Sequence, residues 1–148
     1  MDNHLSFEDI LDQYGELTYT NIGVSMMPML REKRDVFTVR KKEGRCQVND
    51  VALFRRGNRY VLHRVIEVTD EGYTMLGDNC VLPEKDVKEE DVLGVMVSFQ
   101  RDGKLIQATD PKYLRYVSWI RRTENMRHDM KKTAGKLKRL LTGKQPAQ

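Results

Sequence analysis

The stretch Tyr60-Val61-Leu62-His63-Arg64-Val65-Ile66-Glu67-Val68 is the clearest β-strand in the chain. Its β-branched residues favour extended backbone, and turn signals flank it, Gly57-Asn58 before and Asp70-Glu71-Gly72 after. We therefore expect one partner strand before it, at 50–54, and another after it, at 73–76. Alternate side chains of a strand point to opposite faces. One face would carry Val61, His63 and Val65, and the other Leu62, Arg64 and Ile66.

The rest of the chain adds short strands and shows no alternation of strands with helices. We expect strands at 18–22, 35–40, 92–99 and 105–108, the last two joined by a hairpin at Asp102-Gly103. Loops are expected at 41–49 and, for the acidic segment, at 83–91. Half a dozen short strands without βαβ units predict a mainly β fold, either a bent antiparallel sheet or a partly open barrel.

Both ends of the chain carry helix signals. Ser6 is a favourable N-cap for a short helix that ends before Gly15. Asp110-Pro111 begins a C-terminal helix that we expect to run past Met130. A stripe on that helix would dock on the sheet through Leu114, Val117 and Ile120. The basic stretch after it is expected to fray, and 145–148 to be disordered.

These signals divide the chain into three parts with different charge. They are an N-terminal helical segment (1–17), a β domain (18–109) and a basic C-terminal helix and tail (110–148). The segment 111–148 holds 11 basic and 2 acidic residues, whereas the net charge of the whole chain is +4. The body is therefore acidic, and an acidic partner is one reason for a basic tail.

The composition excludes several classes of protein. The 148 residues suit one domain with a substantial core. The chain has no run of about 18 apolar residues for a transmembrane helix, and its acidic N-terminus does not resemble a signal peptide. We therefore expect a cytoplasmic protein, with Cys46 and Cys80 as free thiols. No histidine or cysteine cluster has metal-ligand spacing, so neither a metal nor a cofactor is expected.

A second stretch, Gly23-Val24-Ser25-Met26-Met27-Pro28-Met29-Leu30, is the candidate for chemistry. It lies in the window 17–30, which carries no charge. Gly23 allows positive φ or a close backbone approach, and Pro28 fixes φ and interrupts strand pairing. Ser25 would stand on a stiffened corner with its hydroxyl displayed, as serine nucleophiles do. The alternative is a turn with an incidental serine.

Three blocks in a fixed order resemble a known family. They are Ser25-Met26-Met27-Pro28, then His63-Arg64-Val65-Ile66, then Leu76-Gly77-Asp78-Asn79. Their order, spacing and neighbours resemble the signal peptidase I and LexA-like serine peptidase superfamily over roughly 19–99. Many members have a lysine where His63 stands, and the histidine version resembles the archaeal and endoplasmic-reticulum type. True signal peptidases are membrane-anchored, which puts a translocated pre-protein in doubt as the substrate of this chain.

The resemblance implies a serine endopeptidase with a bent sheet or partly open barrel of the signal peptidase and LexA type. Ser25 would be the nucleophile, His63 the general base and Asp78 the residue that orients the imidazole. An unperturbed histidine has a pKa of ~6.5, which predicts activity rising through pH ~6–7. The Ser25 N–H would stabilise the oxyanion, and some relatives add a serine where this chain has Gly23.

Each site residue also has a plain structural interpretation. The alternative for His63 is a half-buried strand histidine, and the alternative for Asp78 is a turn aspartate that caps the loop. Family members sometimes use a second acid downstream, where both Glu84 and Asp86 lie. Three neighbours are expected to have structural roles: Met26, Arg64 and Cys80.

Three functions compete. The leading one is cleavage of an extended peptide or protein substrate, and the second is a non-catalytic peptide-binding module on the same fold. The third is binding of an anionic surface through the basic helix, whose aromatic residues Tyr113, Tyr116 and Trp119 suit peripheral contact with an anionic membrane. Nucleic-acid binding is disfavoured because charge alone supports it.

Overall fold

The structure is a computed structural model that describes residues 4–143. Its first half contains α1 (Phe7–Tyr14), β1 (Glu16–Thr20), β2 (Val36–Lys41), β3 (Val51–Arg56), β4 (Arg59–Val68) and β5 (Gly72–Leu76). Its second half contains β6 (Glu84–Lys88), a 3-10 turn (Glu89–Asp91), β7 (Val92–Arg101), β8 (Lys104–Gln107), α2 (Pro111–Arg122) and α3 (Glu124–Thr142).

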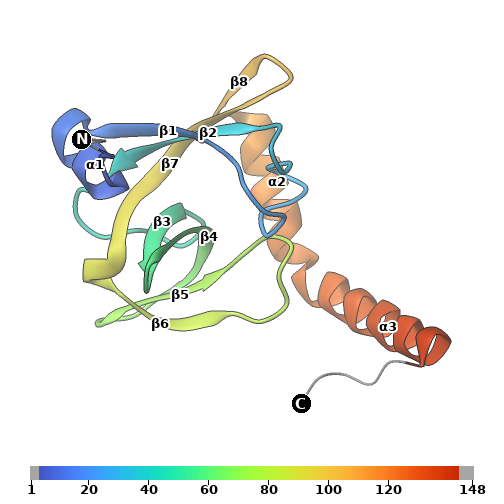
Figure 1. The fold of residues 1–148 in the computed structure, drawn as a ribbon. Helices are drawn as coiled ribbons and strands as arrows, with labels where there is room; N and C mark the ends of the chain where they lie inside the picture. The colour runs from blue at the N-terminus through green and yellow to red at the C-terminus, as the bar shows by residue number, and fades with distance from the viewer. Residues whose placement is uncertain (1–3, 144–148) are drawn as a thin grey trace.

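All eight strands belong to one antiparallel sheet, which curls into a half-barrel (Figure 1). The order along the sheet is β1-β2-β7-β3-β4-β5-β6, and β8 pairs with β7 alone. The long strand β7 lies at the centre because β2 pairs along one edge, while β3 and β8 share the other. The predicted mainly β, bent antiparallel sheet is thus confirmed, with eight strands where seven segments were expected as strands.

The additional strand is β6, in the segment that was expected to be an acidic loop. A loop was expected because four of the five residues of β6 are charged. That expectation was wrong, although only Val87 of the strand is buried. Its strand conformation comes from pairing with β5, where Tyr73 lies opposite Val87. Cross-strand pairing of this kind overrides local preference.

The N-terminal helix forms as its sequence predicts. The Ser6 side chain accepts a hydrogen bond from the Asp9 N–H, and the Asp9 carboxylate accepts one from the Ser6 N–H, which completes a capping box. Gly15 ends the helix in the left-handed region at φ 76°. Leu11 is buried in the core beneath it.

Both helical ends of the chain contribute to the core of the β domain. Leu11 of α1, Met29 and Phe99 belong to the same cluster of buried residues as Tyr113 and Val117 of α2. The buried residues of α2 are Tyr113, Val117 and Ile120. The prediction for Leu114 was wrong, because 53% of its surface is exposed and Tyr113 takes its place against the sheet.

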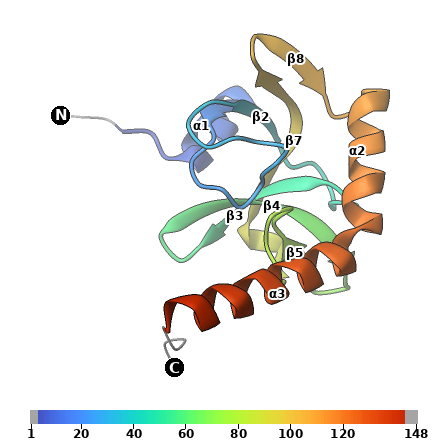
Figure 2. The same cartoon turned by 90° about the vertical axis from the view of Figure 1, so that its right-hand side faces the viewer.

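The predicted C-terminal helix is two helices. A break at Thr123 separates α2, which stands against the sheet, from α3, which turns away and runs along the outside of the molecule (Figures 1 and 2). The structure describes every residue of α3, and none of them is buried. Among residues 4–143, no helix is both long and apolar enough to cross a membrane. The disorder expected at 145–148 lies outside the described residues.

Candidate active site

The corner that carries Ser25 is stabilised by hydrogen bonds inside its own loop and by a buried side chain. Gly23 adopts φ 89°, which places it in the region that favours glycine. The buried Asn21 side chain donates hydrogen bonds to the carbonyls of Gly23 and Leu30, which closes the loop on itself. Met26 is only 1% exposed and anchors the corner in the core, as predicted.

The corner rests on the loop that follows β5. The Asn79 N–H donates to the Ser25 carbonyl over 2.9 Å, and the Asn79 side chain donates to the Val24 carbonyl over 3.0 Å. The Asp78 N–H points to the sulfur of Met26 at 3.4 Å. Within residues 4–143, neither the N–H nor the hydroxyl of Ser25 makes a hydrogen bond. Both groups are therefore unpaired within the described residues, and Ser25 itself is half-buried.

Gly77 is the point at which the serine corner and the histidine strand meet. A β-carbon at this position would lie 2.6 Å from the Ser25 carbonyl oxygen, 3.1 Å from Nε2 of His63 and 2.7 Å from Sγ of Cys80. No side chain fits there, since β-carbons do not approach backbone oxygen so closely. The Ser25 backbone carbonyl and the His63 ring therefore both lie against Gly77, and a side chain at this position would collide with them.

His63, the predicted base, is buried and uncharged at neutral pH. It is 8% exposed, its ring meets Phe54 edge-on at 6.1 Å, and its Nδ1 is buried with no hydrogen-bond partner in the described structure. Burial, together with the positive charge of Arg56, lowers the pKa of His63 to about 4. The expectation of a pKa near 6–7 is therefore revised downwards.

The structure does not bring the carboxylate of Asp78 onto His63. Asp78 accepts two hydrogen bonds of 2.8 Å from the Arg64 guanidinium, and a third of 2.8 Å from the Tyr116 hydroxyl. The side chains of Arg64 and Asp78 are 1% and 2% exposed. Removing one partner of such a buried pair would leave an uncompensated charge, at a cost of about 3–5 kcal/mol. The contacts of Asp78 thus support a structural role, and Arg64 has the structural role that the sequence predicted.

Of the two downstream acids, Glu84 is the one whose charge acts on the pKa of His63. Its negative charge opposes the fall in the pKa of His63 more strongly than that of Asp78 does. Its carboxylate pairs with Arg56, and neither Glu84 nor Asp86 hydrogen bonds to His63 within residues 4–143. Asp86 is exposed. Within the described residues, His63 is therefore a histidine without a hydrogen-bonded acid.

Two basic residues of α3 complete the site, and sequence reasoning missed both. Arg127 donates to the Asp78 carbonyl over 2.8 Å, and Lys131 donates to the backbone and side-chain oxygens of Asn79. Asn79 in turn holds the carbonyls of Val24 and Ser25. Arg127 and Lys131 lie four residues apart and so share one face of a helix. That spacing is the signal available in the sequence, but it is hidden among many other basic residues.

Cys80 lies in the same region as Ser25 and His63. Cys46 and Cys80 are both free thiols, as expected. Burial raises the pKa of the Cys80 thiol, which keeps it protonated and fits a packing role beside Gly77. Among the residues that the structure describes, no group of three or more histidine, cysteine or acidic side chains could hold a metal ion.

Comparisons with protein-family models, with curated proteins and with solved structures found no significant match. The resemblance to signal peptidases therefore rests on the residues of this chain alone.

Proposed function

We propose that this protein is a signal-peptidase-like serine endopeptidase in which Ser25 is the nucleophile and His63 the general base. The observation that supports the proposal is that the backbone carbonyl of Ser25 and Nε2 of His63 both lie against Gly77, which puts the corner and the histidine in one region. The two residues come from separate segments of the chain, and only a glycine fits between them.

The proposed reaction is acyl transfer to serine and then to water. The Ser25 hydroxyl oxygen attacks the carbonyl carbon of the scissile bond while His63 Nε2 accepts its proton. The free Ser25 N–H stabilises the developing oxyanion. The C–N bond then breaks, and the imidazolium returns the proton to the leaving amine. Water releases the acyl group by the same steps, and the serine is regenerated.

Substrate would bind in an extended conformation beside the corner. Strand β1 is at one end of the sheet order, pairs with β2 alone and leads towards Ser25. An exposed edge of this kind can accept a peptide as an added strand, and the main-chain hydrogen bonds then set the register of the scissile bond.

Covalent labelling of Ser25 by a fluorophosphonate probe tests the proposal. The wild type should be labelled, and Ser25→Ala should not be labelled at all. Ser25 is a half-buried corner residue, so the variant should keep its melting temperature within about 3 °C. Ser118→Ala, a serine exposed on α2, is the matched control and should label normally. Labelling that survives in Ser25→Ala would refute the proposal and favour a peptide-binding module.

A second proposal concerns the partner of α3. Its exposed face carries apolar side chains at intervals of four, seven and four residues, at Met126, Met130, Leu137 and Leu141, with Leu140 beside them. Basic residues flank them at Lys132, Lys136 and Arg139. An exposed helix with an apolar face and a basic face is typical of peripheral attachment to an anionic membrane. We propose that α3 attaches the peptidase to such a surface.

A further inference from the structure

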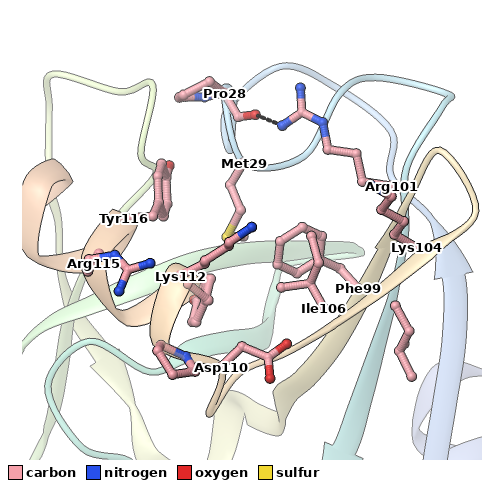
Figure 3. Close-up of a pocket in the computed structure, with 13 residues that line it drawn as sticks. Pro28, Met29, Phe99, Arg101, Lys104, Ile106, Asp110, Lys112, Arg115 and Tyr116 are labelled. Carbon is pink, nitrogen blue, oxygen red and sulfur yellow. Dashed lines mark hydrogen bonds between the residues drawn. The ribbon is translucent and has the colours of Figure 1, made fainter.

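A groove separate from Ser25 and His63 lies on the other side of the serine corner. It has a volume of about 760 Å³ and is bounded by the corner, the β7–β8 hairpin and α2 (Figure 3). Its apolar lining includes Met29, Phe99, Leu105, Ile106, Tyr113 and Tyr116. Met29 points into the groove between the corner and α2, and Arg101 donates to the Pro28 carbonyl over 3.0 Å at its upper edge (Figure 3).

The edge of this groove is positively charged. Four cations line it, at Arg101, Lys104, Lys112 and Arg115, against the single acid Asp110. The Asp110 carboxylate accepts a hydrogen bond from the Gln107 N–H. In the part of the chain that the structure describes, none of the four cations forms an ion pair. An apolar floor with unpaired cations around it is complementary to a ligand that combines apolar groups with negative charge.

The groove is within reach of a substrate at Ser25. Pro28 lies three residues after Ser25, and adjacent Cα atoms are about 3.8 Å apart, so this wall begins within about 11 Å of the nucleophile. An extended peptide spans that distance with about three or four residues. The outer edge of β8 also lacks a partner strand within residues 4–143. The main-chain N–H and C=O groups of a peptide bound here could therefore hydrogen bond to the unpaired edge of β8.

We propose that this groove binds the segment of the peptide substrate next to the scissile bond, and that the segment combines apolar side chains with carboxylates. The proposal deepens the proposed peptidase function and rests on it for the identity of the ligand. A peptide is favoured over a lipid because the groove shares the corner residues with the nucleophile and has an unpaired strand edge along it. The apolar side chains fill the groove, and Lys104, Lys112 and Arg115 pair with the carboxylates.

Fluorescence polarisation with a synthetic peptide tests the groove. The probe is a fluorescein-labelled peptide with leucine-phenylalanine-leucine between two pairs of glutamates, and the protein is full-length Ser25→Ala, which cannot turn it over. Binding should weaken by about tenfold or more when Lys112→Glu and Arg115→Glu are combined, which corresponds to about 1.4 kcal/mol. Both side chains are exposed, so folding is preserved. Lys132→Glu with Lys136→Glu on α3 makes the same change in net charge and should leave binding unchanged.

Three results would overturn the proposal. The first is no binding of the peptide, and the second is equal weakening by the α3 control pair, which would mean general charge attraction. The third is binding of sodium laurate, measured by calorimetry, where the peptide itself fails to bind, which would make the groove an acyl-chain site. The assay requires no cleavage. Peptide binding without fluorophosphonate labelling would therefore reject the catalytic proposal while the groove stands.

Discussion

At the scale of single residues, the proposed site combines a buried, neutral imidazole with a serine hydroxyl that makes no hydrogen bond within residues 4–143. Burial keeps His63 uncharged far below neutral pH, so it can accept a proton across the physiological range. The same burial makes it a weak base, and no acid hydrogen bonds to its Nδ1 in the described structure. Without that acid, the imidazolium formed during attack lacks the stabilisation that the triad arrangement gives.

The pH dependence of labelling follows from this environment. The fluorophosphonate labelling rate of the free protein should stay nearly constant from pH 8 to pH 5 and fall only near the pKa of about 4. A rate that halves at pH 6–7 would show that His63 is not held in this buried state or is not the base. His63→Gln should reduce labelling by about a hundredfold or more, within the range for loss of a general base.

The free energy of unfolding should also depend on pH through His63, and it should decrease as the pH falls. In the unfolded chain His63 has a pKa of ~6.5, so between pH 6.5 and about 4 the unfolded state binds a proton that the folded state excludes. The folded state therefore loses stability as pH falls, by about 2–3 kcal/mol near pH 4.5. Urea unfolding of the wild type and His63→Gln at pH 7 and pH 4.5 would isolate this contribution. A difference between the two proteins that does not change with pH would contradict it.

Ser25 and His63 could be chosen as candidates from the sequence and stay predictions, whereas the partner of Asp78 could not be predicted. A serine between glycine and proline marks a corner in any fold, and a histidine in a strongly β-branched stretch marks a strand. Which side chain Asp78 meets depends on how the loop 77–80 lies over β4. Neighbouring residues of a strand point to opposite faces, so a carboxylate paired with Arg64 does not also reach the ring of His63.

At the scale of elements, the loop 77–80 connects the helices to the serine corner. On one side Asn79 holds the carbonyls of Val24 and Ser25, and on the other Lys131 of α3 holds Asn79. The strands and the first helix could be predicted from local patterns and capping. The break at Thr123 and the strand β6 could not, because each depends on contacts between segments distant in the sequence.

Removing the Lys131 contact should slow the chemistry with little effect on the fold. In Lys131→Ala we expect fluorophosphonate labelling about tenfold slower, since one charge-assisted hydrogen bond is worth about 1.5 kcal/mol. Lys131→Arg should restore much of the rate, and the exposed neighbour Lys132→Ala serves as the control. Equal labelling of the two alanine variants would show that Asn79 holds the corner without help from α3.

At the scale of the whole molecule, the two parts of the C-terminal segment differ in role. Val117 and Ile120 of α2 are buried, so this helix is part of the β domain. α3 lies outside the core and exposes large apolar side chains, including Leu140 at 81% and Leu141 at 78%. Apolar surface of this kind, bordered by lysine and arginine, marks a binding surface rather than a solvated one.

A vesicle-binding experiment distinguishes attachment of α3 to a membrane from pairing of α3 with a second copy of this chain. The wild type should co-sediment with phosphatidylglycerol vesicles at low salt and much less with phosphatidylcholine vesicles, because each basic residue near an anionic surface contributes about 1 kcal/mol. Leu140→Asp with Leu141→Asp should abolish binding and leave the melting temperature unchanged, since both side chains are exposed. Leu82→Asp, at a leucine 86% exposed on the body, is the control and should bind normally. If the intact protein ignores the vesicles but sediments as a dimer, and the double variant is a monomer, then α3 pairs with a second α3 and membrane attachment is rejected.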